Sequence, residues 1–271
     1  MTTRLLWLGI LQGLTEFLPV SSSGHLSIVQ NLWGFESPPL GFDLTLHGAT
    51  LLATLLFFRK AWWRVLAEWV CGWGKTRGER GQGWKTGWAI LAGTIVTAVV
   101  GLPLKAAVES AMSSLRIVGA LLLVNAGILF VANRLAERAG HRDANLPVGL
   151  GVGLAQGMAV FPGISRSGST ISCGLYLGLS AKEAFDFSFL MSLPAIAGAL
   201  LLETAEMGGV AGFLSSLPRG WWMGAMAAFL SGLCALAVLR RFVVRGKWSV
   251  FAVYSAIAGL GALLAGFAGR G

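Results

Sequence analysis

The most informative shortage in this sequence is charge. Only 12% of its 271 residues are Asp, Glu, Lys or Arg, whereas 55% are hydrophobic. A soluble domain would carry roughly a quarter charged residues, so the composition excludes an ordinary soluble protein and indicates an integral membrane protein. The formal net charge of +9 does not indicate a nucleic-acid-binding face, because the basic residues fall in short clusters between apolar runs.

Cysteine is also scarce. Cys71, Cys173 and Cys234 have no metal-ligand spacing, and an odd number of cysteines does not make a disulfide framework. We expect them to be packing residues. A secretory signal peptide is not expected either, since polar residues and a proline interrupt the N-terminal apolar run and no small-residue cleavage site follows it.

Long apolar runs, by contrast, are plentiful. A transmembrane helix takes roughly 17–25 apolar residues, and six runs reach that length. They predict an all-α integral membrane protein with six transmembrane helices. The runs are approximately 42–60, 86–104, 115–133, 184–203, 220–239 and 249–268.

Two further apolar stretches, residues 9–25 and 153–168, carry polar residues that are expensive to place in lipid. The second stretch repeats the first at a constant offset of 144 residues. The matching positions show that one element has been used twice. Gly9, Gln12, Gly13, Phe17, Ser21, Ser23 and Gly24 recur as Gly153, Gln156, Gly157, Phe161, Ser165, Ser167 and Gly168.

Each repeated stretch is a short apolar run, a break rich in Pro, Ser and Gly, and a second short run. Segments of this length predict re-entrant helical hairpins. Pro19 and the Pro162-Gly163 pair should end the first half-helix, and the serines that follow can cap the second. At a rise of ~1.5 Å per residue, about ten residues reach halfway into the hydrocarbon, so each break should lie near the midplane.

Lysine and arginine give the orientation. Segments 60–85, 134–145 and 240–247 are basic, whereas 105–114 and 204–219 carry few cations. Six spans alternate consistently if the basic segments are cytoplasmic. The first hairpin then enters from the outer face and the second from the cytoplasm.

Each hairpin and its three following spans make one repeat, and an odd number of spans turns the second repeat upside down. The sequence therefore predicts a single membrane domain over 1–271, with repeat one at about 1–133 and repeat two at about 146–271. Inverted repeats of this kind place a shared site at the midplane.

The breaks have the composition of anion-binding sites. The N-terminus of a helix presents unpaired backbone N–H groups and the positive end of its dipole. Glycine lets a ligand approach the backbone, and serine adds hydroxyl donors. Two such cradles suit two phosphates. We expect them at Ser21, Ser22, Ser23 and Gly24, and at Ser165, Arg166, Ser167 and Gly168.

The positions at which the two copies differ indicate chemistry. Glu16 is opposite Val160, and the first copy has His25 where the second has Ser169. Conversely, the second copy has Arg166 where the first has Ser22. A fixed cation facing proton-transfer groups suits phosphoryl transfer.

Structural interpretations of these residues stay open. The serines and glycines can serve close helix packing, and Glu16, His25 and Arg166 can form a purely structural polar cluster. Gln12 lies on the same helix face as Glu16 and suits either ligand contact or packing. Asp43 and His47 share a face at the start of the next span; they suit support of the site, or Asp43 can cap that helix.

With these residues in view, the chain resembles the bacterial undecaprenyl-diphosphate phosphatase family associated with bacitracin resistance. The first family motif is matched by Gln12, Glu16 and the SSSGH that ends at His25. The resemblance covers essentially the whole chain. The second motif, Pro-Gly-x-Ser-Arg-Ser-x-x-Thr, is matched by Pro162, Gly163, Ser165, Arg166, Ser167 and Thr170.

The resemblance implies a multi-pass enzyme of the bacterial plasma (inner) membrane with its active site open to the outer face. It would hydrolyse undecaprenyl diphosphate to undecaprenyl phosphate and inorganic phosphate, which recycles the lipid carrier for peptidoglycan. It also implies a divalent cation, Mg²⁺ or Ca²⁺, with Glu16 as a ligand. Many members have two glutamates where this chain has Gln12 and Glu16, so a cation held by two carboxylates is not expected. A homodimer stays open as a partner.

From these residues we expect Ser22 to be the nucleophile and His25 its general base or acid, with Glu16 binding the cation or orienting the imidazole. Arg166 and the loop amides would stabilise the transferred phosphoryl group. Attack by His25 or by water stays open. We expect the substrate to contact Gln12, Ser21, Ser23, Gly24, Ser165, Ser167, Gly168 and Thr170.

An inverted-repeat transporter or flippase of a prenyl phosphate lipid is the rival interpretation, because it would share this architecture. The Glu–Ser–His set together with the Ser–Arg–Ser set favours an enzyme, since binding an anion does not require so many groups.

Overall fold

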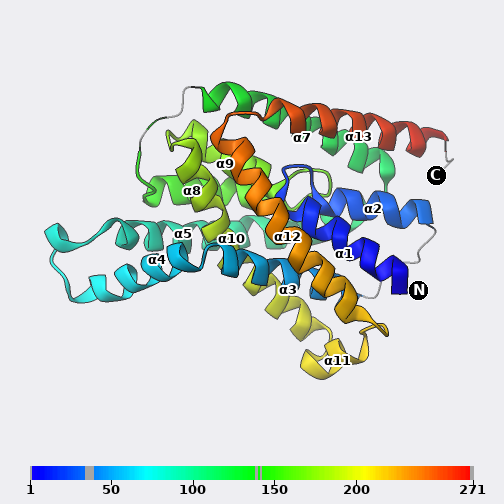
Figure 1. Cartoon of the computed structure of the whole chain (residues 1–271), viewed down its shortest axis with the longest axis horizontal. Helices are drawn as coiled ribbons and strands as arrows, with labels where there is room; N and C mark the ends of the chain where they lie inside the picture. The colour runs from blue at the N-terminus through cyan, green and yellow to red at the C-terminus, as the bar shows by residue number, and fades with distance from the viewer. Residues whose placement is uncertain (1, 34–39, 138–139, 141, 269–271) are drawn as a thin grey trace.

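The computed structural model describes residues 2–33, 40–137, 140 and 142–268, and every regular element in them is helical (Figure 1). The expected all-α class is therefore confirmed for this part of the chain. Many large apolar side chains stay on the outside of the helices: Leu201 is 73% exposed, Leu264 70% and Val99 69%. Apolar surface of this extent needs a covering, which a bilayer provides for a multi-pass membrane protein.

The six expected spans are present as six helices long and apolar enough to cross a membrane. The second span is longer than expected, because α5 continues through a short 3-10 turn, η3, into α6. The spans are α3 (Leu40–Phe57), α5 (Gln82–Gly101) with η3 (Leu102–Leu104) and α6 (Lys105–Met112), α7 (Leu115–Ala136), α10 (Ala181–Glu206), α12 (Trp221–Val244) and α13 (Ser249–Ala268).

The two repeated stretches each form two short helices separated by a break. Each of these helices has 11 to 16 residues, which is shorter than the roughly 17–25 residues of a membrane span. Each break contains the proline that was expected to end the first half-helix, Pro19 in the first stretch and Pro162 in the second. The helices are α1 (Thr2–Phe17) and α2 (Ser22–Trp33), then α8 (Leu146–Met158) and α9 (Arg166–Tyr176).

The two halves of the chain interlock. α1 packs along α12, α8 packs along α5, and α7 lies beside α13 along one edge of the molecule (Figure 1). Close approach of the helices depends on repeated glycines. A Cβ on Gly9 would lie 2.1 Å from the Gly224 carbonyl oxygen, and one on Gly153 would lie 2.4 Å from the Gly93 carbonyl oxygen.

The remaining elements lie outside this interlocked core. α4 packs against α5 of that core and lies to one side of the molecule, and α11 lies at another edge (Figure 1). The span predicted at 42–60 ends at Phe57, because α4 starts with Arg59 and Lys60. These elements are α4 (Arg59–Cys71), the short 3-10 turns η1 (Gly72–Gly74) and η2 (Arg77–Glu79), and α11 (Gly209–Ser215).

Aromatic side chains pack against the end of α1, next to the first break. Phe17, the last residue of α1, is 1% exposed and packs with its ring centroid 5.8 Å from that of Phe189 on α10. Phe58 and Phe185 continue this cluster, with centroids 5.6 Å apart. Because Phe17 follows Glu16 directly, this packing fixes the end of α1 that carries the carboxylate.

Candidate active site

The two breaks lie against each other, although they are far apart in the sequence. The backbone N–H of Gly163 donates to the Ser21 hydroxyl at 2.9 Å, and the Ser167 hydroxyl donates to the Phe17 carbonyl at 2.9 Å. These contacts bring the N-termini of α2 and α9 to one place. The convergence of the two motif stretches that the repeat predicted is therefore present.

Ser21 has an unusual backbone conformation. Its φ of 68° makes it the one residue other than glycine with a positive φ in the described part of the chain. Such a conformation costs about 1–3 kcal/mol and persists only where the surroundings fix it. Its hydroxyl accepts the N–H groups of Gly24, at 3.3 Å, and of Gly163, so the same side chain caps α2 and attaches it to the second break.

Asn125, in the middle of α7, ties the two breaks together from a third direction. Its Nδ2 donates to the Pro19 carbonyl at 2.9 Å, and its Oδ1 accepts the Ser165 N–H at 3.0 Å. The residue is 0% exposed. Sequence reasoning missed Asn125; the available signal was an amide side chain in the centre of an otherwise apolar span.

We expect Asn125→Ala to destabilise the protein. The substitution leaves the Ser165 N–H and the Pro19 carbonyl buried without partners, at a cost of about 1–3 kcal/mol. Thermal unfolding of the purified protein in detergent would measure the loss. Val124→Ala, on the exposed side of the same helix, is the matched control, and equal melting temperatures for the two variants would contradict this role.

Glu16 is the centre of the polar network. Its Oε1 accepts from the Arg166 guanidinium, and its Oε2 accepts from the Ser22 hydroxyl at 2.8 Å and from Gln12 Nε2 at 3.0 Å. The carboxylate is buried, at 8% exposure, and the Arg166 side chain is 18% exposed. A buried carboxylate and guanidinium stabilise each other's charge in low dielectric, so this pair is electrically neutral until another anion arrives.

His25 has different partners from those that sequence reasoning expected. Its Nδ1 lies 2.8 Å from the Ser21 carbonyl, and its Nε2 lies 2.9 Å from the Tyr254 hydroxyl, with the two rings stacked. Because a carbonyl only accepts, Nδ1 carries the proton, and Nε2 accepts from Tyr254.

Among the described residues, Ser22 and His25, expected to act as nucleophile and general base or acid, do not bond to each other, and Glu16 does not bond to the imidazole. The Ser22 hydroxyl donates to Glu16 instead, and the backbone of Ser21 fixes the ring of His25. Tyr254, one of two tyrosines in the chain, is a further residue that the sequence analysis did not identify.

Four backbone N–H groups at the starts of α2 and α9 have no acceptor among the described residues. They belong to Ser22 and Ser23 at the start of α2, and to Arg166 and Ser167 at the start of α9. Unpaired amides at a helix N-terminus, with the dipole behind them, favour an anion. Two such termini beside one guanidinium suit a ligand with two phosphates.

A family model described as bacitracin resistance protein BacA matches residues 5–261 of the chain. The chain belongs to the BacA family. Proteins named undecaprenyl-diphosphatase are similar over nearly the full length. The one from Desulfosudis oleivorans is 42% identical over 260 residues, which are 93% of this chain and 94% of the relative. The one from Desulforapulum autotrophicum is 40% identical over 270 residues, 96% of each.

In this BacA-family chain, most of the residues that were expected to contact substrate hold the breaks together. Ser165 caps α9 by accepting the Gly168 N–H, and Thr170 bonds to the Arg166 carbonyl and to Ser188 of α10. A Cβ on Gly24 would lie 3.0 Å from the Gly163 backbone nitrogen. Ser21, Gly24, Ser165, Ser167, Gly168 and Thr170 are all buried, whereas Ser22, Ser23 and Arg166 are partly accessible.

A further polar group near Glu16 comes from α3. His47 Nε2 lies 3.8 Å from Glu16 Oε2, and His47 Nδ1 lies 2.9 Å from the Asp43 carbonyl. The Asp43 Oδ1 is buried and has no hydrogen-bond partner among the residues that the structure describes. His47 therefore contacts the site directly, which favours the supporting role over a purely capping role for this helix start.

The donor set for a metal ion is small. In the described ranges, no three His, Cys, Asp or Glu side chains are grouped to hold one. The buried Gln12 Oε1, however, has no hydrogen-bond partner within the described part of the chain and lies on the side chain that bonds to Glu16. One carboxylate and one free amide oxygen fit a hard cation that takes its other ligands from phosphate and water.

Proposed function

We propose that this BacA-family protein hydrolyses undecaprenyl diphosphate to undecaprenyl phosphate and inorganic phosphate, and so recycles the lipid carrier of cell-wall synthesis. The relatives named undecaprenyl-diphosphatase cover more than 90% of the chain. The observation that carries the chemistry is the Arg166–Glu16 pair between two helix N-termini with unpaired amides.

The architecture that supports this function is a pair of inverted-topology repeats, about 1–133 and 146–271, within one membrane domain. Each contributes one re-entrant hairpin. Two observations support the repeat: α1 packs on α12 as α8 packs on α5, and Gly9 and Gly153 each make the close contact. The basic segments then face the cytoplasm of a bacterial inner membrane, and the site opens to the outer face.

Substrate binding would divide the Arg166–Glu16 pair. A diphosphate carries more negative charge than one carboxylate. Each phosphate also presents pairs of oxygens that can accept two parallel hydrogen bonds from a guanidinium. Arg166 and the free amides of the two helix starts would therefore bind the phosphates. Glu16, released from Arg166, keeps its hydrogen bond to the Ser22 hydroxyl and stays in place to accept its proton.

The first chemical step is attack by Ser22 Oγ on the terminal phosphorus. A bond forms between the serine oxygen and phosphorus, and the bond from phosphorus to the bridging oxygen breaks, so that its electron pair leaves with undecaprenyl phosphate. Glu16 takes the hydroxyl proton and passes it to the departing monophosphate. Arg166 stabilises the charge on the transferred phosphoryl oxygens.

Water completes the reaction. It attacks the phosphorus of the serine ester, the bond to Ser22 Oγ breaks, and one proton from water restores the hydroxyl. His25 serves this transfer through Nε2 once the Tyr254 hydroxyl moves aside, because Nδ1 stays on the Ser21 carbonyl.

A divalent cation, Mg²⁺ or Ca²⁺, would enter with the diphosphate. Glu16 and the free Gln12 Oε1 are the protein oxygens that would hold it, and the phosphates and water would supply its other ligands. When bound, it would add positive charge beside the transferred phosphoryl group.

Chelation is therefore expected to lower phosphate release and Mg²⁺ to restore it. Because Gln12 supplies one neutral oxygen, Gln12→Glu should lower the Mg²⁺ concentration needed for half-maximal rate, whereas Gln12→Leu should raise it. A rate that is indifferent to chelator in the wild type and in both variants would contradict a cation.

The direct test of the function is phosphate release from undecaprenyl diphosphate by the pure protein in detergent micelles. Release with multiple turnovers is expected, and equimolar undecaprenyl phosphate should accumulate. Binding of the lipid without phosphate release would instead favour the transporter interpretation.

A further inference from the structure

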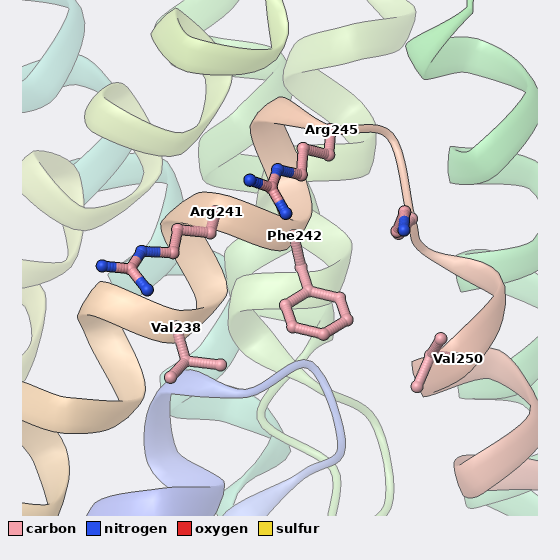
Figure 2. Close-up of a pocket in the computed structure, with 6 residues that line it drawn as sticks. Val238, Arg241, Phe242, Arg245 and Val250 are labelled. Carbon is pink, nitrogen blue, oxygen red and sulfur yellow. The ribbon is translucent and has the colours of Figure 1, made fainter.

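A hollow that is separate from the candidate active site lies between the end of α12 and the start of α13 (Figure 2). Its volume is about 360 Å³. None of its lining residues belongs to the Glu16–Arg166 network. The lining combines three cations with three apolar side chains: Arg241, Arg245 and Lys247, and Val238, Phe242 and Val250.

The cations of this hollow have no anionic partner among the described residues. Arg241 and Arg245 are one helical turn apart, and their guanidinium groups extend to the same side of α12 (Figure 2). In the part of the chain that the structure describes, no side-chain hydrogen bond or ion pair is made by either arginine or by Lys247. The neighbouring Arg240 differs, because its charge interacts with Asp186. Three unpaired cations around one hollow repel one another, so an anion bound there would relieve the repulsion.

The apolar half of the lining distinguishes this hollow from a site for a soluble ion. Val238 is 38% exposed and Val250 is 54% exposed. The Phe242 ring points between the two helices, away from the guanidinium groups (Figure 2), and packs with its centroid 5.3 Å from that of Phe251. The hollow thus has a charged rim where α12 leaves its apolar span and an apolar wall toward that span.

We propose that this hollow binds an anionic phospholipid, with the lipid phosphate between Arg241, Arg245 and Lys247 and one acyl chain along Val238, Phe242 and Val250. Basic pockets between membrane helices bind anionic headgroups through charge, and each cation near the membrane surface adds to the affinity. The apolar wall adds the contact that a free phosphate cannot make.

The test uses the full-length protein in mild detergent and native mass spectrometry. Phosphatidylglycerol and phosphatidylcholine with the same acyl chains are added separately, and inorganic phosphate is the soluble competitor. The wild type should retain phosphatidylglycerol, and the double variant Arg241→Gln/Arg245→Gln should bind it about tenfold or more weakly. Arg240→Gln is the matched control, since it removes one cation from the same helix end but not from the hollow, and should bind as the wild type does.

A second variant addresses the acyl chain. Val250→Ser replaces an exposed apolar side chain of the wall and should weaken retention of phosphatidylglycerol while all three cations remain. Equal retention of phosphatidylcholine, displacement of the lipid by inorganic phosphate, or unchanged binding in a correctly folded double variant would each overturn the proposal. Gel filtration and the melting temperature establish folding for every variant.

Discussion

Replacement of Arg166 by alanine is expected to lower phosphate release from undecaprenyl diphosphate by about 10³-fold or more, the range found when an arginine that stabilises a transferred phosphoryl group is removed. The guanidinium is the one arginine or lysine group in contact with Glu16 among the described residues. Its loss removes positive charge from the transition state. It also leaves the Glu16 carboxylate buried and negative where the diphosphate must bind.

The repulsive part of this effect can be separated from the catalytic part. In the double variant Glu16→Gln/Arg166→Ala, the uncompensated carboxylate is absent, so substrate binding should recover relative to Arg166→Ala while turnover stays low. Arg166→Lys keeps the charge but loses the planar fork that binds two oxygens at once, and should fall between the alanine variant and the wild type.

Steady-state rates at several lipid concentrations, with gel filtration of each variant, provide the measurement. Arg166→Ala protein that is folded and turns over like the wild type would contradict the central role of this residue. An Arg166→Lys variant that is no better than Arg166→Ala would contradict a contribution from the charge alone and would assign the effect to the planar fork.

The ion pair also explains how the site stays stable without substrate. The repeat at constant offset was sufficient to predict that the two breaks meet and bring Glu16 near Arg166, although the two residues occupy different positions in their copies. It did not predict that Ser22 and Gln12 both donate to the other carboxylate oxygen of Glu16. That arrangement depends on the turn of the α1–α2 break, where Ser21 takes a positive φ that no residue type in the sequence indicates.

The spans and breaks were predictable for a different reason. Bilayer thickness and proline geometry are local constraints, so apolar length and Pro19 suffice to find them. Asn125 and Tyr254 are long-range partners: they bond to residues 106 and 229 positions away. An amide or a phenol inside an apolar run marks a polar contact in the membrane, but not with which residue. The helix packing decides which residue is the partner, and it places the Tyr254 hydroxyl beside His25.

The same packing separates two groups of serines that look alike in the sequence. Ser21, Ser165 and Ser167 are buried, whereas Ser22 and Ser23 are partly accessible. The hydroxyls of Ser21 and Ser167 bond to the opposite break, and that of Ser165 caps its own helix. From composition alone, all five serines are expected to contribute to the anion-binding breaks. Only the position of each hydroxyl relative to the second break distinguishes a structural cap from a group that substrate can reach.

Ser22→Ala should lower turnover by at least about 10³-fold, because it removes both the attacking oxygen and the proton that Glu16 accepts. Ser23→Ala is the matched control: it removes a hydroxyl from the next residue, whose single side-chain contact is a long 3.4 Å approach to Ser21, and should reduce turnover by about tenfold or less.

The intermediate itself separates the two protein nucleophiles. With terminally labelled undecaprenyl diphosphate and rapid acid quenching, label should remain on the protein, because a serine phosphate ester survives acid whereas a phosphorylated imidazole does not. Peptide mapping should place it on Ser22, and it should be absent from Ser22→Ala. Label that is lost in acid but retained in base would assign the attack to His25, whose Nε2 would first have to leave Tyr254. If Ser22→Ala turns over at the wild-type rate and neither quench retains label, water is the nucleophile and Ser22 only orients it.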